Sequence, residues 1–184
     1  MQLNPSKSAL ANLIDLFNGQ NSQSLTADDF NVGSPVVREP DANPRNTSVT
    51  VSAKVGSEVY KGSQTFTYTR LDINQVATIK ALGEFQSVEG STLADVKNFV
   101  VTSLGLIADD VELVQTEFPT FEDEVNENEF AVLTLRAVSG SYAYIGEVAV
   151  TVVEPIDGRG RMSELYADTE LNGFEYPVVE EPQG

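Results

Sequence analysis

Adjacent carboxylates at two places in the sequence could bind a cation. Asp28 and Asp29 lie in the segment LTADDF, and Asp109 and Asp110 lie in the similar segment LIADDV. Carboxylate oxygens are common calcium ligands. Neither segment has the ligand spacing of a calcium-binding loop, so a metal role for these four residues is the alternative interpretation.

The spacing within LTADDF favours a structural role for its acidic residues. Thr26 and Asp29 are three positions apart, which is the spacing of a one-turn cap. An apolar residue follows each acidic pair, Phe30 in the first segment and Val111 in the second. We therefore expect each pair to close a turn that leads into an apolar strand.

A dense acidic cluster lies further along the chain and could in principle supply an acid and a base. Such chemistry needs a carboxyl group whose pKa is raised by burial. Val125 is the one apolar residue within the cluster, and two asparagines are interleaved with the acids. We expect a solvated loop between strands. The cluster comprises Glu122, Asp123, Glu124, Glu127 and Glu129.

The composition excludes several classes of function. The 184 residues include no His, Cys or Trp, which removes the usual general base near neutral pH, the Ser-His-Asp triad and every thiolate metal site. Lys and Arg total 11 against 28 Asp and Glu, and the resulting net charge of -17 repels nucleic acid phosphates. We expect no enzymatic activity, no cofactor and no nucleic-acid partner.

The sequence also gives no indication of a membrane protein. No apolar run approaches the roughly 18 residues of a membrane helix. The first residues lack the basic start, apolar run and cleavage site of a signal peptide. We therefore expect neither a membrane partner nor secretion.

The two acidic segments belong to a longer internal similarity. An amphipathic helix is predicted before each of them, in SALANLIDLF and in TLADVKNFVV. After each of them, two segments alternate with the period of a strand: TSVTVSA (47–53) and YKGSQTFTY (60–68) match AVLTLRA (131–137) and YIGEVAVTV (144–152). The offset is 84 residues at the strands, 83 at the helices and 81 at the acidic segments. We interpret this order as an internal duplication.

Several residues have expected positions within these repeated elements. Asn4 is expected to cap the first helix, with Pro5 at its first position, and Thr92 with Asp95 forms a capping-box pattern before the second. Tyr60 and Tyr144 each precede a glycine by two residues. We expect both rings to pack against neighbouring strands and not to bind a sugar.

The predicted fold class is α+β, with two tandem small units followed by an extended C-terminal tail. Each unit, 1–73 and 90–155, has a short helix and an antiparallel sheet with a terminal hairpin. Residues 74–89 are expected to be a linker or spacer, and the tail covers 156–184.

The linker sequence itself predicts a short helix. The segment 72–83 has Asp72 and Gln75 at capping spacing, and Gly83 is expected to end the helix.

The tail has the composition of a partner-binding segment. Its Gly158-Arg159-Gly160-Arg161 run lacks the lysine and hydroxyl residue of a phosphate-binding loop. We expect a turn whose arginines meet an acidic neighbouring surface. A tail with isolated apolar residues forms no core alone, so it packs onto the units, pairs with another subunit or stays mobile. The expected partner-binding residues are Arg159, Arg161, Leu171, Phe174 and Tyr176.

Five of these segments together resemble a repeat domain of virion structural proteins from large contractile-tailed bacteriophages of the myovirus, jumbo type. They are NPSKSALANLIDLFN, the LTADD turn, PRNTSVTVSA, YKGSQTFTYTRLDI and the closing ELNGFEYP. The resemblance covers most of the chain, including the more divergent second unit. It implies a particle component and no enzyme, and it transfers no functional residue. Arg70 has no counterpart in the second unit, so any partner contact that it makes belongs to one unit only.

The expected function is therefore that of a non-enzymatic structural protein of a tailed bacteriophage. The resemblance implies a component of the virion, made in the host cytoplasm, as an exterior capsid decoration protein or a tail, neck or baseplate component. Major capsid or tail subunits are the expected partners, and homo-oligomerisation is open. The alternative is an adhesion or carbohydrate-binding module that calcium stabilises.

Overall fold

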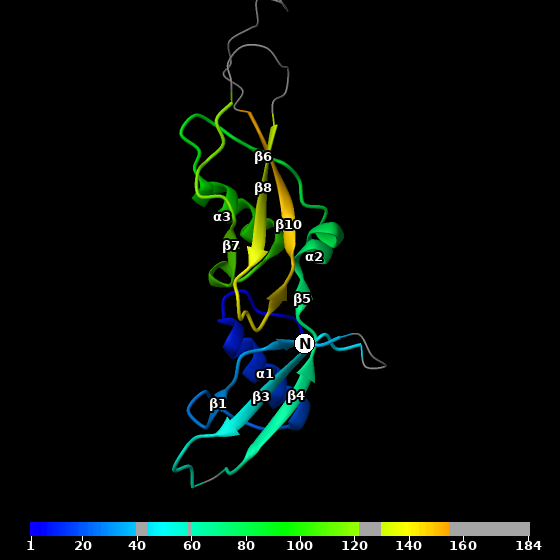
Figure 1. The fold of residues 1–184 in the computed structure, drawn as a ribbon, viewed down its shortest axis with the longest axis vertical. Coiled ribbons are helices and arrows are strands. Elements are labelled where there is room, and N and C mark those ends of the chain that lie inside the picture. The colour runs from blue at the N-terminus through cyan, green and yellow to red at the C-terminus, as the bar shows by residue number, and fades with distance from the viewer. Residues whose placement is uncertain (40–43, 59, 122–129, 155–184) are drawn as a thin grey trace, which may run out of the picture.

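The computed structural model describes residues 1–39, 44–58, 60–121 and 130–154 and has a mixed α+β architecture, as predicted. Figure 1 shows an elongated molecule with one small sheet at each end. The described residues up to Arg70 form the first half, and those from Leu71 to Glu154 form the second half.

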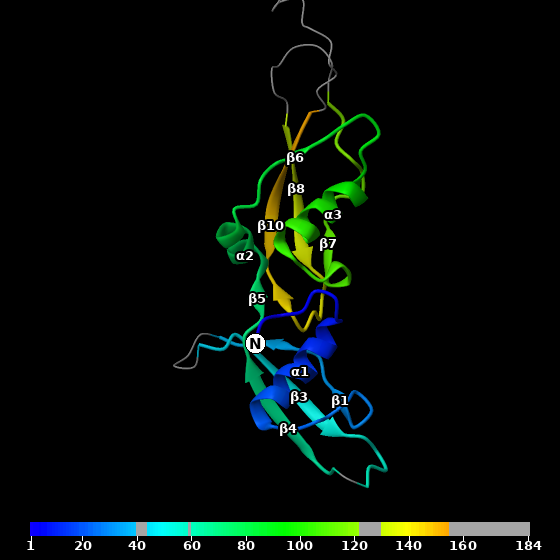
Figure 2. The ribbon, with the colours of Figure 1, turned by 180° about the vertical axis from the view of Figure 1, so that it is seen from behind.

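The first half consists of one helix and a sheet built around a central strand. The helix α1 (Ala9–Asn21) precedes strands β1 (Phe30–Val32), β2 (Val36–Val37), β3 (Thr47–Ala53) and β4 (Ser63–Tyr68). The strands β1 and β2 pair with one side of β3, and β4 pairs with its other side, all antiparallel. Figure 2 shows α1 lying across β3 and β4. The ring centroids of Phe17 and Phe66 are 4.9 Å apart, which packs α1 directly onto β4.

The second half has more elements but a similar centre. Its sheet has the order β6-β10-β8-β7, and a separate short parallel pair joins β5 to β9. The elements are β5 (Leu71–Asp72), α2 (Ile73–Lys80), β6 (Phe85–Gln86), α3 (Leu93–Leu104), a 3-10 turn (Ala108–Asp110), β7 (Val111–Leu113), β8 (Phe130–Ala137), β9 (Tyr144–Ile145) and β10 (Glu147–Val153).

The two hairpins share one pairing register. Val49 of β3 lies opposite Phe66 of β4. Leu133 of β8 lies opposite Val150 of β10, and these two residues follow Val49 and Phe66 by 84 positions each. The common register supports the duplication predicted from the sequence, which stays an interpretation.

The capping residue of the second amphipathic helix was predicted correctly, whereas that of the first was not. Thr92 and Asp95 form a complete capping box at the start of α3. The helix α1 begins after Ser8, whose Oγ accepts from the backbone N–H of Ala11. Asn4 instead closes a separate turn, because its side chain accepts from the N–H of Ser6 at 3.0 Å. Asparagine forms such turns as readily as it caps helices.

The helix α2 begins as predicted and ends earlier. The side chain of Asp72 accepts from the N–H groups of Asn74 and Gln75. The helix ends at Ala81, which adopts a left-handed conformation with φ 51°, and not at Gly83. The N–H of Leu82 donates to the carbonyl of Ala77 at 3.0 Å, which closes the last turn.

The spacer role expected for residues 74–89 does not describe their packing. The helix α2 buries Ile73 and Ala77 within the core of the second half. The strand β6 pairs in parallel with β10, with Phe85 beside Val152. Since apolar burial is determined by tertiary contacts, the short apolar stretches of this segment did not reveal it from the sequence.

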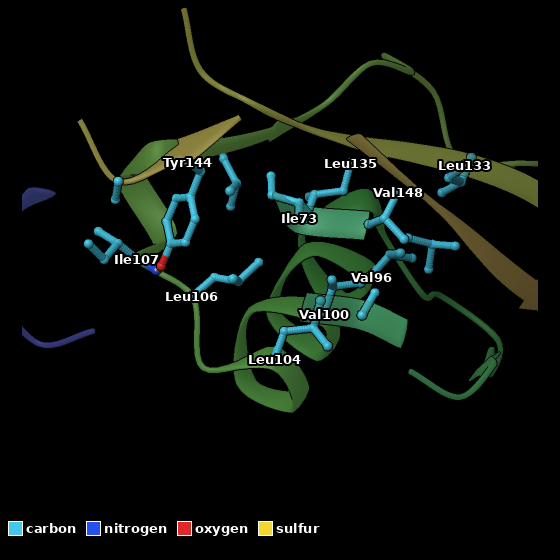
Figure 3. Packing of buried hydrophobic residues seen from close by; sticks show 14 of the residues in the cluster. Ile73, Val96, Val100, Leu104, Leu106, Ile107, Leu133, Leu135, Tyr144 and Val148 are labelled. Atoms are coloured by element: carbon cyan, nitrogen blue, oxygen red, sulfur yellow. The ribbon is translucent and has the colours of Figure 1, made fainter. Parts of the chain in front are cut away.

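Two clusters of buried side chains stabilise the molecule. The smaller one joins Leu13 and Phe17 of α1 to Val49 and Tyr68 of the first sheet. The larger one fills the second half between α3, α2 and the inner face of the sheet (Figure 3). Figure 3 also shows the hydroxyl of Tyr144 directed at the backbone of Ile107, whose N–H donates to it at 3.0 Å.

Two isoleucines of α2 provide a matched test of this packing. Ile73 is fully buried and Ile79 is 76% exposed. Ile73→Ala is expected to lower the free energy of unfolding by about 2–5 kcal/mol because it leaves a cavity. Ile79→Ala is expected to change it by less than about 0.5 kcal/mol. Urea denaturation followed by circular dichroism measures both, and equal losses would show that α2 is a spacer.

Candidate docking site

A loop of the second half, residues 138–143, makes hydrogen bonds that join the two halves. The carbonyl of Tyr142 accepts from the hydroxyl of Tyr68 at 3.0 Å, and the hydroxyl of Tyr142 donates to the carbonyl of Gly33 at 3.2 Å. The two tyrosine bonds fix the first sheet against the second half. Directly after the boundary, the N–H of Leu71 donates to the carbonyl of Ala143 at 2.9 Å, within the second half.

Arg70 is the buried charge at this junction. Its Nε donates to Thr47 Oγ1 at 2.9 Å, and its Nη1 donates to the carbonyl of Ser141 at 3.0 Å and more weakly to that of Tyr144 at 3.5 Å. Burial lowers the pKa of the guanidinium, an effect that Tyr68 opposes, and an arginine stays charged at physiological pH. The arginine that occurs in one unit only thus contacts the other half of its own chain.

The side chain of Asn46 holds the backbone of Arg70 in place. Asn46 Oδ1 accepts from the N–H of Arg70 at 2.9 Å, and Asn46 Nδ2 donates to its carbonyl at 2.9 Å. These two hydrogen bonds fix the backbone from which the side chain of Arg70 extends toward the junction.

Ser141 gives the junction loop its shape. Its Oγ donates to the carboxylate of Asp110 and accepts from the N–H groups of Ala143 at 3.2 Å and Tyr144 at 3.0 Å. The carbonyls that receive Arg70 are thereby held in position. Asp110, the second acid of LIADDV, has a structural role here.

The acids of LTADDF also act within a turn. Asp29 Oδ2 accepts from the N–H and the hydroxyl of Thr26 at 2.6 and 2.9 Å, and these bonds lower the pKa of Asp29. Asp28 is exposed, with an oxygen 3.6 Å from Lys54 Nζ. The predicted turn, followed by a strand that begins at Phe30, is confirmed. Across the described residues, no three acidic side chains lie close enough together to hold a metal ion.

The two recurring tyrosines have different environments. Tyr144 is buried, as predicted, but Tyr60 is 40% exposed and the packing prediction for it is wrong. The tip of the first hairpin, around Val55 and Tyr60, extends into solvent, whereas the equivalent tip of the second hairpin is the junction loop. The sequence could not show this difference, because it depends on how the halves pack.

A pocket of about 290 Å³ lies beside the junction. Side chains from α1, from the end of β4, from β5 and from the junction loop line it together with the first residues of the chain. Most of these side chains are apolar, as expected for a surface that receives another apolar group. They include Leu3, Leu13, Leu16, Tyr68, Leu71 and Tyr142.

The strand β4 adds an open edge next to this pocket. The N–H of Ala53 donates to the carbonyl of Gly62, so alternate residues of β4 direct their backbone groups toward β3. By this alternation Ser63, Thr65 and Thr67 direct theirs outward. Among the described residues, no other strand pairs with β4.

The residues of this site were not predicted from the sequence, and the residues that were predicted lie elsewhere. Leu13 and Tyr68 were visible only as apolar positions of a helix and a strand, and nothing indicated that Tyr142 would meet them. The predicted partner-binding residues Arg159, Arg161, Leu171, Phe174 and Tyr176 lie outside the described residues, as do Glu122, Asp123, Glu124, Glu127 and Glu129.

Comparison with known proteins places the chain in a family. A family of unknown function (DUF7941) matches residues 3–183 of the chain. No curated protein and no solved structure matches it. None of the helices in the described part of the chain has both the length and the apolar character that a membrane span requires.

Replacing Arg70 is expected to destabilise the fold. Arg70→Met leaves Thr47 Oγ1 and the carbonyl of Ser141 without this donor, and we expect the free energy of unfolding to fall by about 2–4 kcal/mol. Arg136→Met is the control, because its 2.8 Å ion pair with Glu112 is half exposed and contributes less than about 1 kcal/mol. Chemical denaturation measures both. A loss for Arg70→Met no larger than that for Arg136→Met would contradict the role of the buried guanidinium.

Tyr68 is expected to make the fold sensitive to alkali. Burial is the main cause that raises its pKa to about 12, from an ordinary value of 10.0. The neutral phenol is therefore favoured in the folded state, and its contribution to stability is complete below pH 10 and is lost as the pH rises toward 12.

Denaturation midpoints measured between pH 8 and pH 12 test this expectation, because this range includes the ordinary pKa of tyrosine and the raised pKa of Tyr68. Tyr68→Phe is expected to remove this part of the pH dependence. It also removes one hydrogen bond, which lowers the free energy of unfolding at neutral pH by about 0.5–1.5 kcal/mol. The exposed Tyr60→Phe is the control and keeps the wild-type profile. Identical alkaline profiles for all three proteins would refute the assignment.

Proposed function

We propose that the chain, which belongs to DUF7941, a family of unknown function, is a non-enzymatic structural protein of a tailed-bacteriophage virion. The proposal places it on the outside of the capsid, as a decoration protein, or in the tail, neck or baseplate. It is made in the host cytoplasm and becomes part of the particle. Its partners are major capsid or tail subunits.

The observation that carries this proposal is the open edge of β4 beside an apolar pocket. An unpaired edge strand presents free N–H and C=O groups, which pair with a strand from another chain. The pocket lies next to this edge and offers side-chain contacts at the same place. A surface that combines strand addition with an apolar pocket suits assembly on a neighbouring protein.

The charge of the chain and the resemblance to virion repeat domains add support. A net charge of -17 is unfavourable next to packaged DNA and favours a position on the exterior of the particle. Many identical subunits on one particle convert a modest individual contact into stable attachment.

One exposed ring favours a second candidate function. Tyr60 is 40% exposed at the tip of the first hairpin, near the fully exposed Val55. An exposed tyrosine can stack on a sugar ring, which is the chemistry of an adhesion or carbohydrate-binding module. Glycan binding that is lost in Tyr60→Ala would favour this alternative.

Loading onto particles tests the proposed function and the role of β4 together. Purified chain is added to particles that lack it, and the bound fraction is measured by sedimentation and mass spectrometry. Thr65→Pro is expected to weaken loading at least about tenfold, because proline removes an outward N–H from the edge while edge strands tolerate it. Thr65→Val keeps the N–H and is the matched control.

The two variants also define the results that contradict the proposal. Circular dichroism first establishes that both are folded. Equal loading of Thr65→Pro and Thr65→Val would show that β4 is not the contact. No loading of the wild-type chain on capsids or tails, together with its absence from purified particles, would refute the virion role.

A further inference from the structure

In the second half, a segment of the chain covers the outer edge of the hairpin. The strand β6 pairs in parallel with β10, and the N–H and the hydroxyl of Ser87 both donate to the carbonyl of Val153. The helix α2 packs against both β10 and α3 and places Ile73 and Ala77 in the core. Residues 71–87, which follow the first hairpin, thus complete the second half.

The first half presents the same surface without such a cover. Its hairpin has the register of the second, and its helix α1 packs on the sheet through Phe17 and Phe66. In the second half, Phe85 of β6 lies beside Val152 of β10 and packs its ring against Phe99 of α3, with 5.6 Å between the ring centroids. At the corresponding position of the first half, between α1 and the end of β4, the structure has the pocket lined by Leu13, Leu16 and Tyr68. Among the described residues, no helix or strand fills it.

We propose that residues 155–184 of a second molecule of this chain occupy the pocket and the adjacent edge of β4. These residues follow the second hairpin as residues 71–87 follow the first. The contact joins molecules head to tail. Within one molecule, residues 71–87 join the first hairpin to the second half in the same order. The inference rests on the proposed function in assembly and names its partner as another copy of the same chain.

The length and composition of residues 155–184 fit this role. The segment has 30 residues, compared with the 17 of residues 71–87. It contains apolar residues that a pocket of this kind can receive, whereas a segment with such scattered apolar residues forms no core alone. They are Leu165, Tyr166, Leu171, Phe174, Tyr176 and Val178.

The geometry favours a second molecule over the same one. In Figure 1, β10 runs away from the junction, toward the end of the molecule opposite α1 and β4. Within the chain, the first hairpin is followed by a segment, residues 71–87, that packs on the unit after it. After the second unit, the next surface of this kind is the first half of another molecule. Such a heterologous contact builds rings or filaments.

Sedimentation velocity of the purified full chain tests the proposal without any phage particle. A salt concentration of about 0.5 M shortens the range of charge repulsion between the acidic molecules to a few Å. We expect association that increases with protein concentration. A synthetic peptide of residues 155–184, added in excess, is expected to return the chain to monomers.

Variants at the pocket establish where the contact lies. Leu71 lines the pocket and is 42% exposed, so Leu71→Asp places a charge there, and we expect association at least tenfold weaker. Val55→Asp carries the same change on the fully exposed hairpin tip, away from the pocket, and is expected to associate like the wild type. Thr69→Glu, at an exposed position that also lines the pocket, replaces Leu71→Asp if that variant does not fold.

Each result separates the proposal from its alternatives. Monomers at every concentration would overturn it and favour residues 155–184 folding back on their own chain. Association that neither Leu71→Asp nor the peptide weakens would overturn it in favour of another self-contact. Because loading onto particles is a separate measurement, the virion role can fail or hold independently of self-association.

Discussion

The buried guanidinium of Arg70 is the interaction on which the arrangement of the two halves depends. A charge removed from water must be surrounded by oxygen atoms. In the described structure its neighbours are Thr47 Oγ1 from the first sheet and the carbonyls of Ser141 and Tyr144 from the second half. The first half alone supplies one of these three acceptors. The arginine is therefore satisfied only when the loop from 138 to 143 is in place.

The two hairpins share one pairing register but have different surroundings. The tip of one hairpin extends into solvent with Val55 and Tyr60, and the tip of the other folds onto its neighbour through Tyr142. The outer edge of β10 pairs with β6 at Val152 and Val153, while no described strand pairs with the outer edge of β4. Two hairpins of the same register thus lie in one half where the chain packs on the end of the outer edge and in one half where, among the described residues, that edge has no strand beside it.

Local sequence signals predicted the elements of the fold but not their assembly. The α+β class, both hairpins and the cap of α3 follow from periodicity and from the spacing of Thr92 and Asp95, which act over a few residues. Asn4 misled the prediction of the α1 cap because one side chain suits two local structures. The pocket could not be predicted, since it brings Leu13, Tyr68 and Tyr142 together across more than 100 positions of sequence.

The long sequence separation of the junction contacts has a consequence for synthesis on the ribosome. The hydrogen bond from Tyr68 to Tyr142 spans 74 positions, and that from Arg70 to Ser141 spans 71. At about 5–20 residues per second, the ribosome needs on the order of 4–15 seconds to add the loop after Arg70 has been made. During that interval the nascent first sheet holds a charged side chain without its carbonyl acceptors. The sheet therefore reaches its final stability only after most of the chain has emerged, so the nascent chain gains its full stability in one late step.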